Sequence, residues 1–339
     1  MRGIDTERVG SWLAEHVEGA VAPFRYDLIA GGHSNLTFKV TGADGRRFVL
    51  RRPPLGHVLA TAHDMAREHR IITAVGPTPV PVAPTYGLCT DEQVNGAPFY
   101  VMGFVDGVVL DHPERAEAMT PEARRSAALH LVDVLAELHA VDVDAVGLGD
   151  LAKREGYVER QLKRWSTQWA NSKTRELAAI DEVERLLRER LPAQQGVAIV
   201  HGDYRFGNCL VDPEVGRVAA VLDWELCTLG DPLADVGYLG VYWTDPGAVS
   251  KRANDPTGAG GFPSYAELLE RYAQRTGRDL SGIEYYRAFS SWRLAVISEG
   301  VYARYLHGVM ADEKADVEGF KVGVEQLAES ALAAVRSLP

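Results

Sequence analysis

HGDYRFGN, at residues 201–208, and VLDWE, at residues 221–225, are the two stretches that decide the fold. In each, a short apolar run typical of a buried strand leads into a polar turn. The turns carry three oxygen-bearing side chains, Asp203, Asn208 and Asp223, at the predicted ends of adjacent strands. Phosphoryl transfer needs this set, because one carboxylate orients the attacking hydroxyl while an amide oxygen and a second carboxylate hold Mg²⁺. Asp203 is therefore the predicted base, and Asn208 and Asp223 are the predicted metal ligands.

These residues resemble the signature of the aminoglycoside phosphotransferase/choline kinase family, which is HGDxxxxN followed by a strand and an aspartate. The resemblance covers most of the chain and implies a protein kinase-like fold that uses ATP or GTP with Mg²⁺. GDPLAD at 230–235 and LRRPP at 50–54 are most similar to a bacterial branch related to the kinase-like domain of some acyl-CoA dehydrogenase-associated proteins. The alternative for HGDYRFGN is a polar turn in which Asp203 and Asn208 bond to their own backbone.

The order of the apolar patterns predicts a sheet-rich first part and a helix-rich second part. The first part has predicted helices at 5–18 and 61–75 and predicted strands at 26–30, 36–41, 46–51, 85–88 and 99–104. The second part has predicted strands at 197–200, 209–211 and 218–222 and predicted helices at 120–139, 231–242, 264–276, 282–307 and 312–338. We therefore expect a bilobal α+β fold of the protein kinase-like type, with a small antiparallel-sheet N-terminal lobe at residues 1–104 and a helical C-terminal lobe at residues 105–339.

A glycine-rich loop between two predicted strands is the candidate phosphate cover. Gly31 and Gly32 allow backbone N–H groups to approach phosphate oxygens, while Ser34 and Asn35 add polar side chains. The loop departs from GxGxxG, so a plain hairpin turn remains the alternative.

FVLR, at residues 48–51, occupies the position where related kinases carry a strand lysine that contacts the nucleotide phosphates. Strand alternation and the alignment select Arg51 as this cation, with Arg52 as the second choice. Arginine retains the role because it can pair with phosphate or carboxylate in a bidentate manner. Glu68, on the next predicted helix, is the expected ion-pair partner, although an exposed helix glutamate is the ordinary alternative.

The segment at residues 99–107 resembles the connection between the lobes, whose backbone usually hydrogen-bonds the purine. Met102 and Phe104 are therefore candidate adenine-site residues, and a core strand that ends in a turn is the alternative. Asp231 precedes a proline at a predicted helix start, where its carboxylate caps free N–H groups. By the family resemblance, this aspartate also braces the catalytic loop.

Composition excludes several classes of protein. Among 339 residues, 46% are hydrophobic and 24% are charged, which is typical of a globular protein. The net charge of −11 offers no general attraction to nucleic acid, and no run of apolar residues is long enough to insert into a membrane. Three cysteines without paired spacing, and a start without a signal-peptide pattern, predict a cytoplasmic location.

The expected partner is a small-molecule acceptor that carries a hydroxyl. Residues 251–339 hold 12 acidic and 11 basic side chains, so no acidic wall favours a polycationic antibiotic. The resemblance instead favours a hydroxyacyl or other lipid-like acceptor. A nucleotide-binding pseudokinase remains the alternative, because Arg51 replaces the usual lysine, and a Mg²⁺-dependent phosphohydrolase is a further rival.

Overall fold

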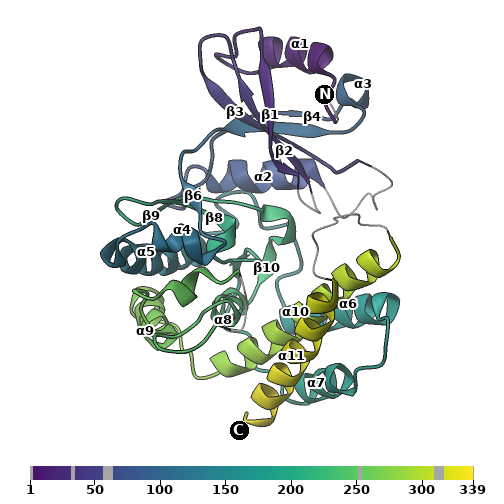
Figure 1. The fold of residues 1–339 in the computed structure, drawn as a ribbon, viewed down its shortest axis with the longest axis vertical. Coiled ribbons are helices and arrows are strands. Elements are labelled where there is room, and N and C mark those ends of the chain that lie inside the picture. The colour runs from purple at the N-terminus through teal and green to yellow at the C-terminus, as the bar shows by residue number, and fades with distance from the viewer. Residues whose placement is uncertain (1–2, 32–34, 56–63, 251–253, 309–316, 339) are drawn as a thin grey trace. The chain divides into compact units, whose positions relative to one another are not determined.

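The computed structural model describes residues 3–31, 35–55, 64–250, 254–308 and 317–338 (Figure 1). These residues group into two compact units, each built from separate stretches of the chain. The first unit comprises Met1–Asp111, Arg115–Gly149 and Phe206–Leu226, and the second comprises His112–Glu114, Asp150–Arg205 and Cys227–Pro339. The predicted lobes at 1–104 and 105–339 were defined by their expected roles, whereas these units are defined by contacts between residues. The predicted lobe boundary therefore stays a prediction.

A five-stranded antiparallel sheet dominates the N-terminal part of the first unit, in the order β1-β2-β3-β5-β4. Its strands are β1 (Arg25–Gly31), β2 (Leu36–Thr41), β3 (Arg47–Arg52), β4 (Thr85–Cys89) and β5 (Phe99–Gly103). The helices of this region are α1 (Thr6–His16), α2 (Met65–Val75) and the single turn α3 (Glu92–Asn95). In Figure 1, α1 lies over one face of the sheet and α2 over the other.

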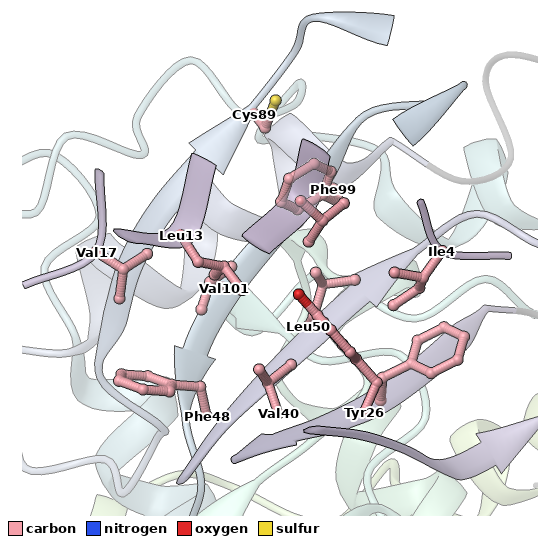
Figure 2. Close-up of a cluster of buried hydrophobic side chains, with 12 residues drawn as sticks. Ile4, Leu13, Val17, Tyr26, Val40, Phe48, Leu50, Cys89, Phe99 and Val101 are labelled. Carbon is pink, nitrogen blue, oxygen red and sulfur yellow. The ribbon is translucent and has the colours of Figure 1, made fainter. Parts of the chain in front are cut away.

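The core between α1 and the sheet orients the site residues. Figure 2 shows Leu13 of α1 together with Phe48, Leu50 and Val101 of the sheet in one buried cluster. Each fully buried side chain of this size stabilises the fold by about 1.5–3 kcal/mol. Because Phe48 and Leu50 point into this core, alternation directs Arg51 to the opposite face, which α2 covers.

A second, three-stranded sheet completes the first unit in the order β6-β8-β9. It consists of β6 (Val108–Val109), β8 (Cys209–Asp212) and β9 (Arg217–Val221), and it packs near α5 (Pro121–Ala140). The β8–β9 turn approaches α5 so closely that a Cβ on Gly216 would lie 2.0 Å from the carbonyl oxygen of Ala123. Gly216 also has a φ of +65°, so glycine is required there on both counts.

Helices make up most of the second unit. They are α6 (Tyr157–Ser172), α7 (Ala178–Glu189), α8 (Leu233–Val241), α9 (Tyr265–Thr276), α10 (Ile283–Leu306) and α11 (Val317–Arg336). The short strands β7 (Ala198–Val200) and β10 (Thr228–Gly230) pair antiparallel, and α4 (Pro113–Glu117) spans a boundary between the units. α10 is buried on most sides, and it packs beside α11, α8, α6 and α7 (Figure 1).

The predicted α+β class is confirmed, with element ends mostly within a few residues of those expected. Two helices, α6 and α7, were not expected; neither begins with a side-chain cap, so the usual start signal is missing. β6, β10, α3 and α4 were also not anticipated, since elements of two to five residues carry little periodicity. In the described part of the chain, no helix is both long and apolar enough to cross a membrane.

Candidate active site

Arg51 lies between two carboxylates of the first unit. Its Nε is 3.0 Å from Oε2 of Glu68 on α2, and its Nη2 is 2.5 Å from Oδ1 of Asp223. In the register of β3 with β5, Arg51 is directly opposite Tyr100, so both side chains emerge on the face that α2 covers. Burial lowers the pKa of Arg51, but attraction to Glu68, Tyr100 and Asp223 outweighs this and raises it. The guanidinium therefore stays charged.

Glu68 is held by three polar partners. The Tyr100 hydroxyl donates to Oε2 at 2.9 Å, and Nδ2 of Asn35 donates to Oε1 at 3.3 Å, in addition to the Arg51 contact. Burial raises the pKa of Glu68, and the Arg51 charge and the Tyr100 hydrogen bond reverse only part of this rise. The side chain is only 3% exposed, so the alternative of a surface helix glutamate is wrong.

Asp223 has an unusual backbone. It follows β9 with a φ of +63° and is the one non-glycine residue with a positive φ among those that the structure describes. This left-handed conformation costs an L-residue roughly 1 kcal/mol, and such strain persists where the surroundings fix it, often at functional sites. The conformation lets the Asp223 side chain meet Arg51 while 29% of it remains exposed to solvent.

A third carboxylate joins this group. Glu225, on the 3₁₀ turn η2 (Trp224–Leu226), accepts a long 3.4 Å hydrogen bond from Nδ2 of Asn35. Carboxylate oxygens of Glu68, Asp223 and Glu225 all lie within 4.8 Å of one another. Carboxylates are the hard oxygen donors that Mg²⁺ prefers, so the residues present fit this metal. We call Arg51, Glu68, Asp223 and Glu225 the charged cluster.

Asn208 precedes the first strand of the β8–β9 hairpin and Asp223 follows the second, so both residues lie at the open end of the hairpin. It closes the 3₁₀ turn η1 (Phe206–Asn208) directly before β8, and its carbonyl oxygen accepts from the backbone N–H of Leu222 at 2.8 Å. Cys209 pairs with Val221 in the ladder that follows. The hairpin thus brings Asn208 and Asp223 together, while their roles as metal ligands stay a prediction.

Arg52, the second choice for the strand cation, points the other way. Its guanidinium donates to the carbonyl oxygens of Gly3 at 2.6 Å and Asn95 at 3.2 Å, on the α1 side of the sheet. Arg52 is therefore tied to backbone groups, whereas Arg51 meets the carboxylates. Contact of Arg51 with phosphate stays a prediction.

The candidate phosphate loop is described only at its two ends. Gly31 ends β1, and Asn35 is buried beside Glu68; Gly32 and Ser34 lie outside the described residues. Oδ1 of Asn35 has no hydrogen-bond partner among the described residues. A buried acceptor of this kind is costly unless a ligand or water satisfies it.

The two adenine-site candidates sit at the end of β5. Met102 is 9% exposed, and the Phe104 ring lies under the Arg47 guanidinium at 4.5 Å from the ring centroid. Between them, the Gly103 N–H donates to the carbonyl oxygen of Pro84 at 2.7 Å. That contact ties the end of β5 to the segment before β4, and purine binding by this region stays a prediction.

Asp203, the predicted base, belongs to the second unit. Its Oδ1 lies 3.3 Å from Nε of Arg205, and the Arg205 guanidinium stacks 4.9 Å from the centroid of the Tyr242 ring. Burial lowers the pKa of Arg205, but attraction to Asp203 and to Tyr242 outweighs this, so the net pKa is raised. Arg205 therefore stays charged beside the predicted base.

The backbone of the predicted catalytic loop, His201–Asp203, is held by Asp235 rather than by Asp231. The two oxygens of Asp235 accept from the N–H groups of His201 at 2.6 Å and Gly202 at 2.8 Å. Asp231 does cap α8, accepting from Leu233 N–H at 3.0 Å, but its other oxygen accepts from Gln195 N–H and the Tyr286 hydroxyl. The expectation that Asp231 braces the loop is therefore wrong. His201 Nδ1 accepts from the Asp203 N–H at 3.2 Å, so this ring contacts the backbone of the loop.

Sequence reasoning did not identify Tyr100 or Asp235 as part of this site. A tyrosine inside an apolar strand is typical of a core residue. Tyr100 is recognised as a partner of this site only from the β3–β5 register, which puts it opposite Arg51. Asp235 had a usable signal, since it is the last residue of the same GDPLAD stretch as Asp231.

A family model for the phosphotransferase enzyme family matches residues 26–288, which is most of the chain. The chain belongs to this family. A crystal structure from Ralstonia eutropha JMP134, provisionally named an aminoglycoside phosphotransferase, is 35% identical, with a TM-score of 0.81 and coverage of 98% of both chains. These matches confirm the predicted bilobal, kinase-like α+β fold and show a kinase-like phosphotransferase.

Curated relatives of this phosphotransferase family member are longer proteins. Acyl-CoA dehydrogenase family member 10 of Mus musculus is 35% identical over 91% of this chain and 29% of its own length. Probable acyl-CoA dehydrogenase IBR3 of Arabidopsis thaliana is 34% identical over 97% of this chain and 42% of its own length. The chain thus spans less than half of either relative. The predicted resemblance to acyl-CoA dehydrogenase-associated proteins is confirmed.

A more distant structure extends the likeness in fold alone. Aminoglycoside phosphotransferase APH(4)-Ia, solved in a ternary complex with AMP-PNP and hygromycin B, is 16% identical with a TM-score of 0.63. It covers 97% of this chain and 99% of its own.

Proposed function

We propose that this phosphotransferase is a Mg²⁺-dependent small-molecule kinase that moves the γ-phosphoryl group of ATP or GTP to a hydroxyl. The observation that carries the proposal is the position of Arg51 between Glu68 and Asp223. A strand cation anchored by a helix glutamate, next to an aspartate that can hold metal, is the arrangement that phosphoryl transfer uses. The AMP-PNP complex of the more distant neighbour supports the choice of nucleotide.

In this proposal, Arg51 holds the nucleotide phosphates and Glu68 keeps it in place. The loop that includes Gly31, Gly32, Ser34 and Asn35 covers the phosphates with backbone and side-chain donors. The segment that contains Met102 and Phe104 receives the adenine. Arg51 already has two carboxylate partners, and a phosphate can replace Asp223 as one of them without leaving Arg51 unpaired.

Asn208 and Asp223 are the proposed Mg²⁺ ligands, with Glu225 as a nearby third donor. The fit rests on the clustered carboxylate oxygens, which are hard donors suited to this ion. Bound Mg²⁺ would supply charge neutralisation on the phosphates during transfer. Oδ1 of Asp223 pairs with Arg51, so metal binding through this oxygen would replace that ion pair.

Asp203 is the proposed base that orients the acceptor hydroxyl and accepts its proton. Arg205 pairs with Oδ1 of Asp203 at 3.3 Å and so restrains the carboxylate that would orient the hydroxyl. The proposed acceptor is a small molecule, and a hydroxyacyl or lipid-like compound is favoured because the longer curated relatives are named acyl-CoA dehydrogenases. A cytoplasmic location remains part of the proposal.

Thermal unfolding with and without Mg²⁺-ATP or Mg²⁺-GTP tests the nucleotide site. A nucleotide at about 100 times its dissociation constant should add roughly 2.7 kcal/mol of stability. We expect a Mg²⁺-dependent shift with at least one nucleotide in the wild type and its loss in Asp223→Ala. Asp203→Asn is the matched control, because it removes a carboxylate outside the charged cluster and should keep the shift. Absence of any shift in the wild type would overturn the proposal.

Turnover separates the kinase from its alternatives. The Arg51–Asp223 ion pair favours a second candidate, a nucleotide-binding pseudokinase, because it engages the carboxylate that the metal needs. Screening hydroxylated acceptors with Mg²⁺-ATP distinguishes the two, since a pseudokinase binds nucleotide without forming product. We expect Asp203→Asn to lower turnover by about 1,000-fold, within the usual range for loss of a general base. Phosphate release that needs no acceptor would instead indicate a phosphohydrolase.

A further inference from the structure

Arg293 is a buried cation of the second unit. It lies on α10, is 3% exposed, and stacks with its guanidinium 4.3 Å from the Tyr238 ring and 5.9 Å from the Trp165 ring. Aromatic faces repay part of the cost of burying a guanidinium, but a hydrophobic residue of similar size would avoid this cost altogether.

Besides its interaction with Tyr238, Arg293 makes a polar contact to the catalytic loop. Its Nη2 donates a short hydrogen bond to the carbonyl oxygen of Gly202, the residue directly before Asp203. Gly202 has a φ of +86°, a left-handed conformation that favours glycine and directs the carbonyl oxygen away from the usual orientation. Arg293 therefore contacts the backbone at the point where the chain turns into the predicted base.

Asp235 holds the same peptide from its other side. Its carboxylate accepts from the N–H groups of His201 and Gly202, while Arg293 binds the Gly202 carbonyl oxygen. The buried Asp235 carboxylate thus fixes two backbone N–H groups of this segment, and the buried Arg293 guanidinium fixes one of its carbonyl oxygens. We call Asp235 and Arg293 the charge bracket.

Arg293 is also attracted by the Asp203 carboxylate. Burial lowers the pKa of Arg293, and attraction to Tyr238, Tyr157 and the Asp203 carboxylate more than reverses this effect. Charged hydrogen bonds to the backbone are stronger than neutral ones and depend on direction, so the bracket restrains both the position and the rotation of the peptide.

We propose that Arg293 is a positioning residue for phosphoryl transfer, which acts through the Gly202 carbonyl to aim the Asp203 carboxylate at the acceptor hydroxyl. This inference rests on the proposed function of Asp203 as the base. Its consequence is that the loss of Arg293 impairs the chemical step while nucleotide binding is retained, since a misplacement of about 1 Å can cost about 100-fold in rate.

Amide hydrogen exchange of the full chain tests the positioning directly. The variants are Arg293→Met, which keeps the length but removes the charge, and Arg293→Lys, which keeps the charge. The control is Arg278→Met, because Arg278 also donates to a backbone carbonyl of the second unit, that of Gln195 at 2.6 Å. We expect the amides of His201, Gly202 and Asp203 to exchange about tenfold faster in Arg293→Met, as loss of one charged hydrogen bond would produce.

Arg293→Met should show the full local change and Arg293→Lys a smaller one, because lysine keeps the charge but not the guanidinium geometry. Arg278→Met should leave these three amides as in the wild type. Unchanged exchange at the three amides in a folded Arg293→Met protein would overturn the proposal. An increase of equal size across all of α10 and α8 would also overturn it, because it would indicate a purely structural role. Should Arg293→Met not fold, Arg293→Lys carries the test, and wild-type exchange at the loop in that variant counts against the proposal.

Kinetics supply the second readout once an acceptor is found by the screen described above. For Arg293→Met we expect kcat to fall by about 100-fold while KM for Mg²⁺-ATP stays nearly constant, with partial rescue in Arg293→Lys. A rise in KM at constant kcat would contradict a positioning role. A wild type without turnover would refute the proposed kinase function alone, because the exchange experiment still decides whether Arg293 positions the loop.

Discussion

The charged cluster and the catalytic loop use buried charges in opposite ways. In the cluster, Arg51, Glu68 and Asp223 face one another, and each charge is satisfied by another side chain. At the loop, Asp235 accepts from two backbone N–H groups, and Arg293 donates to a backbone carbonyl oxygen. The first arrangement can exchange one charged partner for another. The second cannot change without moving the chain.

This difference assigns separate tasks to the two regions. A side-chain ion pair such as Arg51–Asp223 can open when a phosphate or a metal ion offers an equivalent partner. A buried N–H such as that of Gly202 has no such replacement, and leaving it without a partner costs its full desolvation. We therefore expect changes in the cluster to alter ligand binding, and changes at the loop to alter stability and the rate of chemistry.

Asp235→Ala should give the largest loss of stability. It removes the acceptor for two buried backbone N–H groups, so we expect the free energy of unfolding to fall by about 3 kcal/mol. Urea denaturation with a constant m value measures this loss. Asp235→Asn keeps one carbonyl oxygen as acceptor and should lose about half as much. Equal stability of Asp235→Ala and the wild type would remove the distinction between the two regions.

Arg51→Met and Arg52→Met compare the two tasks on adjacent residues of one strand. Arg52 binds backbone carbonyls, so its replacement should cost roughly 2 kcal/mol of unfolding free energy and leave nucleotide affinity unchanged. Arg51→Met should instead abolish the thermal shift caused by Mg²⁺-ATP. Urea denaturation and thermal shift assays on both variants measure these effects. The reverse pattern would show that Arg52 is the phosphate cation.

Tyr100→Phe sharpens the description of the cluster. It removes only the hydroxyl that donates to Oε2 of Glu68, and we expect a loss of about 1 kcal/mol in unfolding free energy. Nucleotide affinity should change little, because Arg51 still has Glu68 as its anchor. Tyr26→Phe is a matched control in the same unit, since the Tyr26 hydroxyl is buried without a hydrogen-bond partner among the described residues. A larger loss from Tyr26→Phe than from Tyr100→Phe would contradict the assigned contact.

Local patterns were sufficient to predict the strands that carry the cluster. β2 has the expected ends, and the alternation of Phe48, Leu50 and Arg51 correctly separated the core face from the opposite one. These predictions succeed because each depends on neighbouring residues only. The pairing of the helix glutamate with Arg51 also required the family resemblance, because the sequence pattern alone allowed an exposed Glu68.

Contacts between distant residues could not be predicted in the same way. Asn35 bonds to Glu225, 190 residues later, and no local pattern contains that information. Asp231 and Asp235 lie one helical turn apart, and a helix-cap rule selects the first but is silent about which backbone the second reaches. Arg293 reaches the loop only through the packing of α10 against α8. The charge bracket is therefore a property of tertiary structure.

Glu68→Gln tests whether the buried negative charge of Glu68 lowers the free energy of unfolding of the protein without ligand. The folded pKa of Glu68 is raised above its ordinary value of 4.5, chiefly by burial. A carboxyl with a raised folded pKa stabilises the protein fully below its unfolded pKa, and this stabilisation is lost as pH rises through the folded pKa. Wild-type unfolding free energy should therefore decline in the window that begins near pH 4.5 and extends upward, and Glu68→Gln should show less of this decline.

This effect should be the smallest of the four, because the Arg51 charge and the Tyr100 hydroxyl offset much of the burial penalty. The measurement is urea denaturation of both proteins across the acidic to neutral range. Glu329→Gln, at an exposed position on α11, controls for the general loss of one acidic group. A steeper decline in Glu68→Gln than in the wild type would mean that Arg51 stabilises the ionised form more than burial opposes it. The Arg51–Glu68 ion pair would then stabilise the fold, as the backbone contacts of the loop do. The two regions would no longer differ in their task.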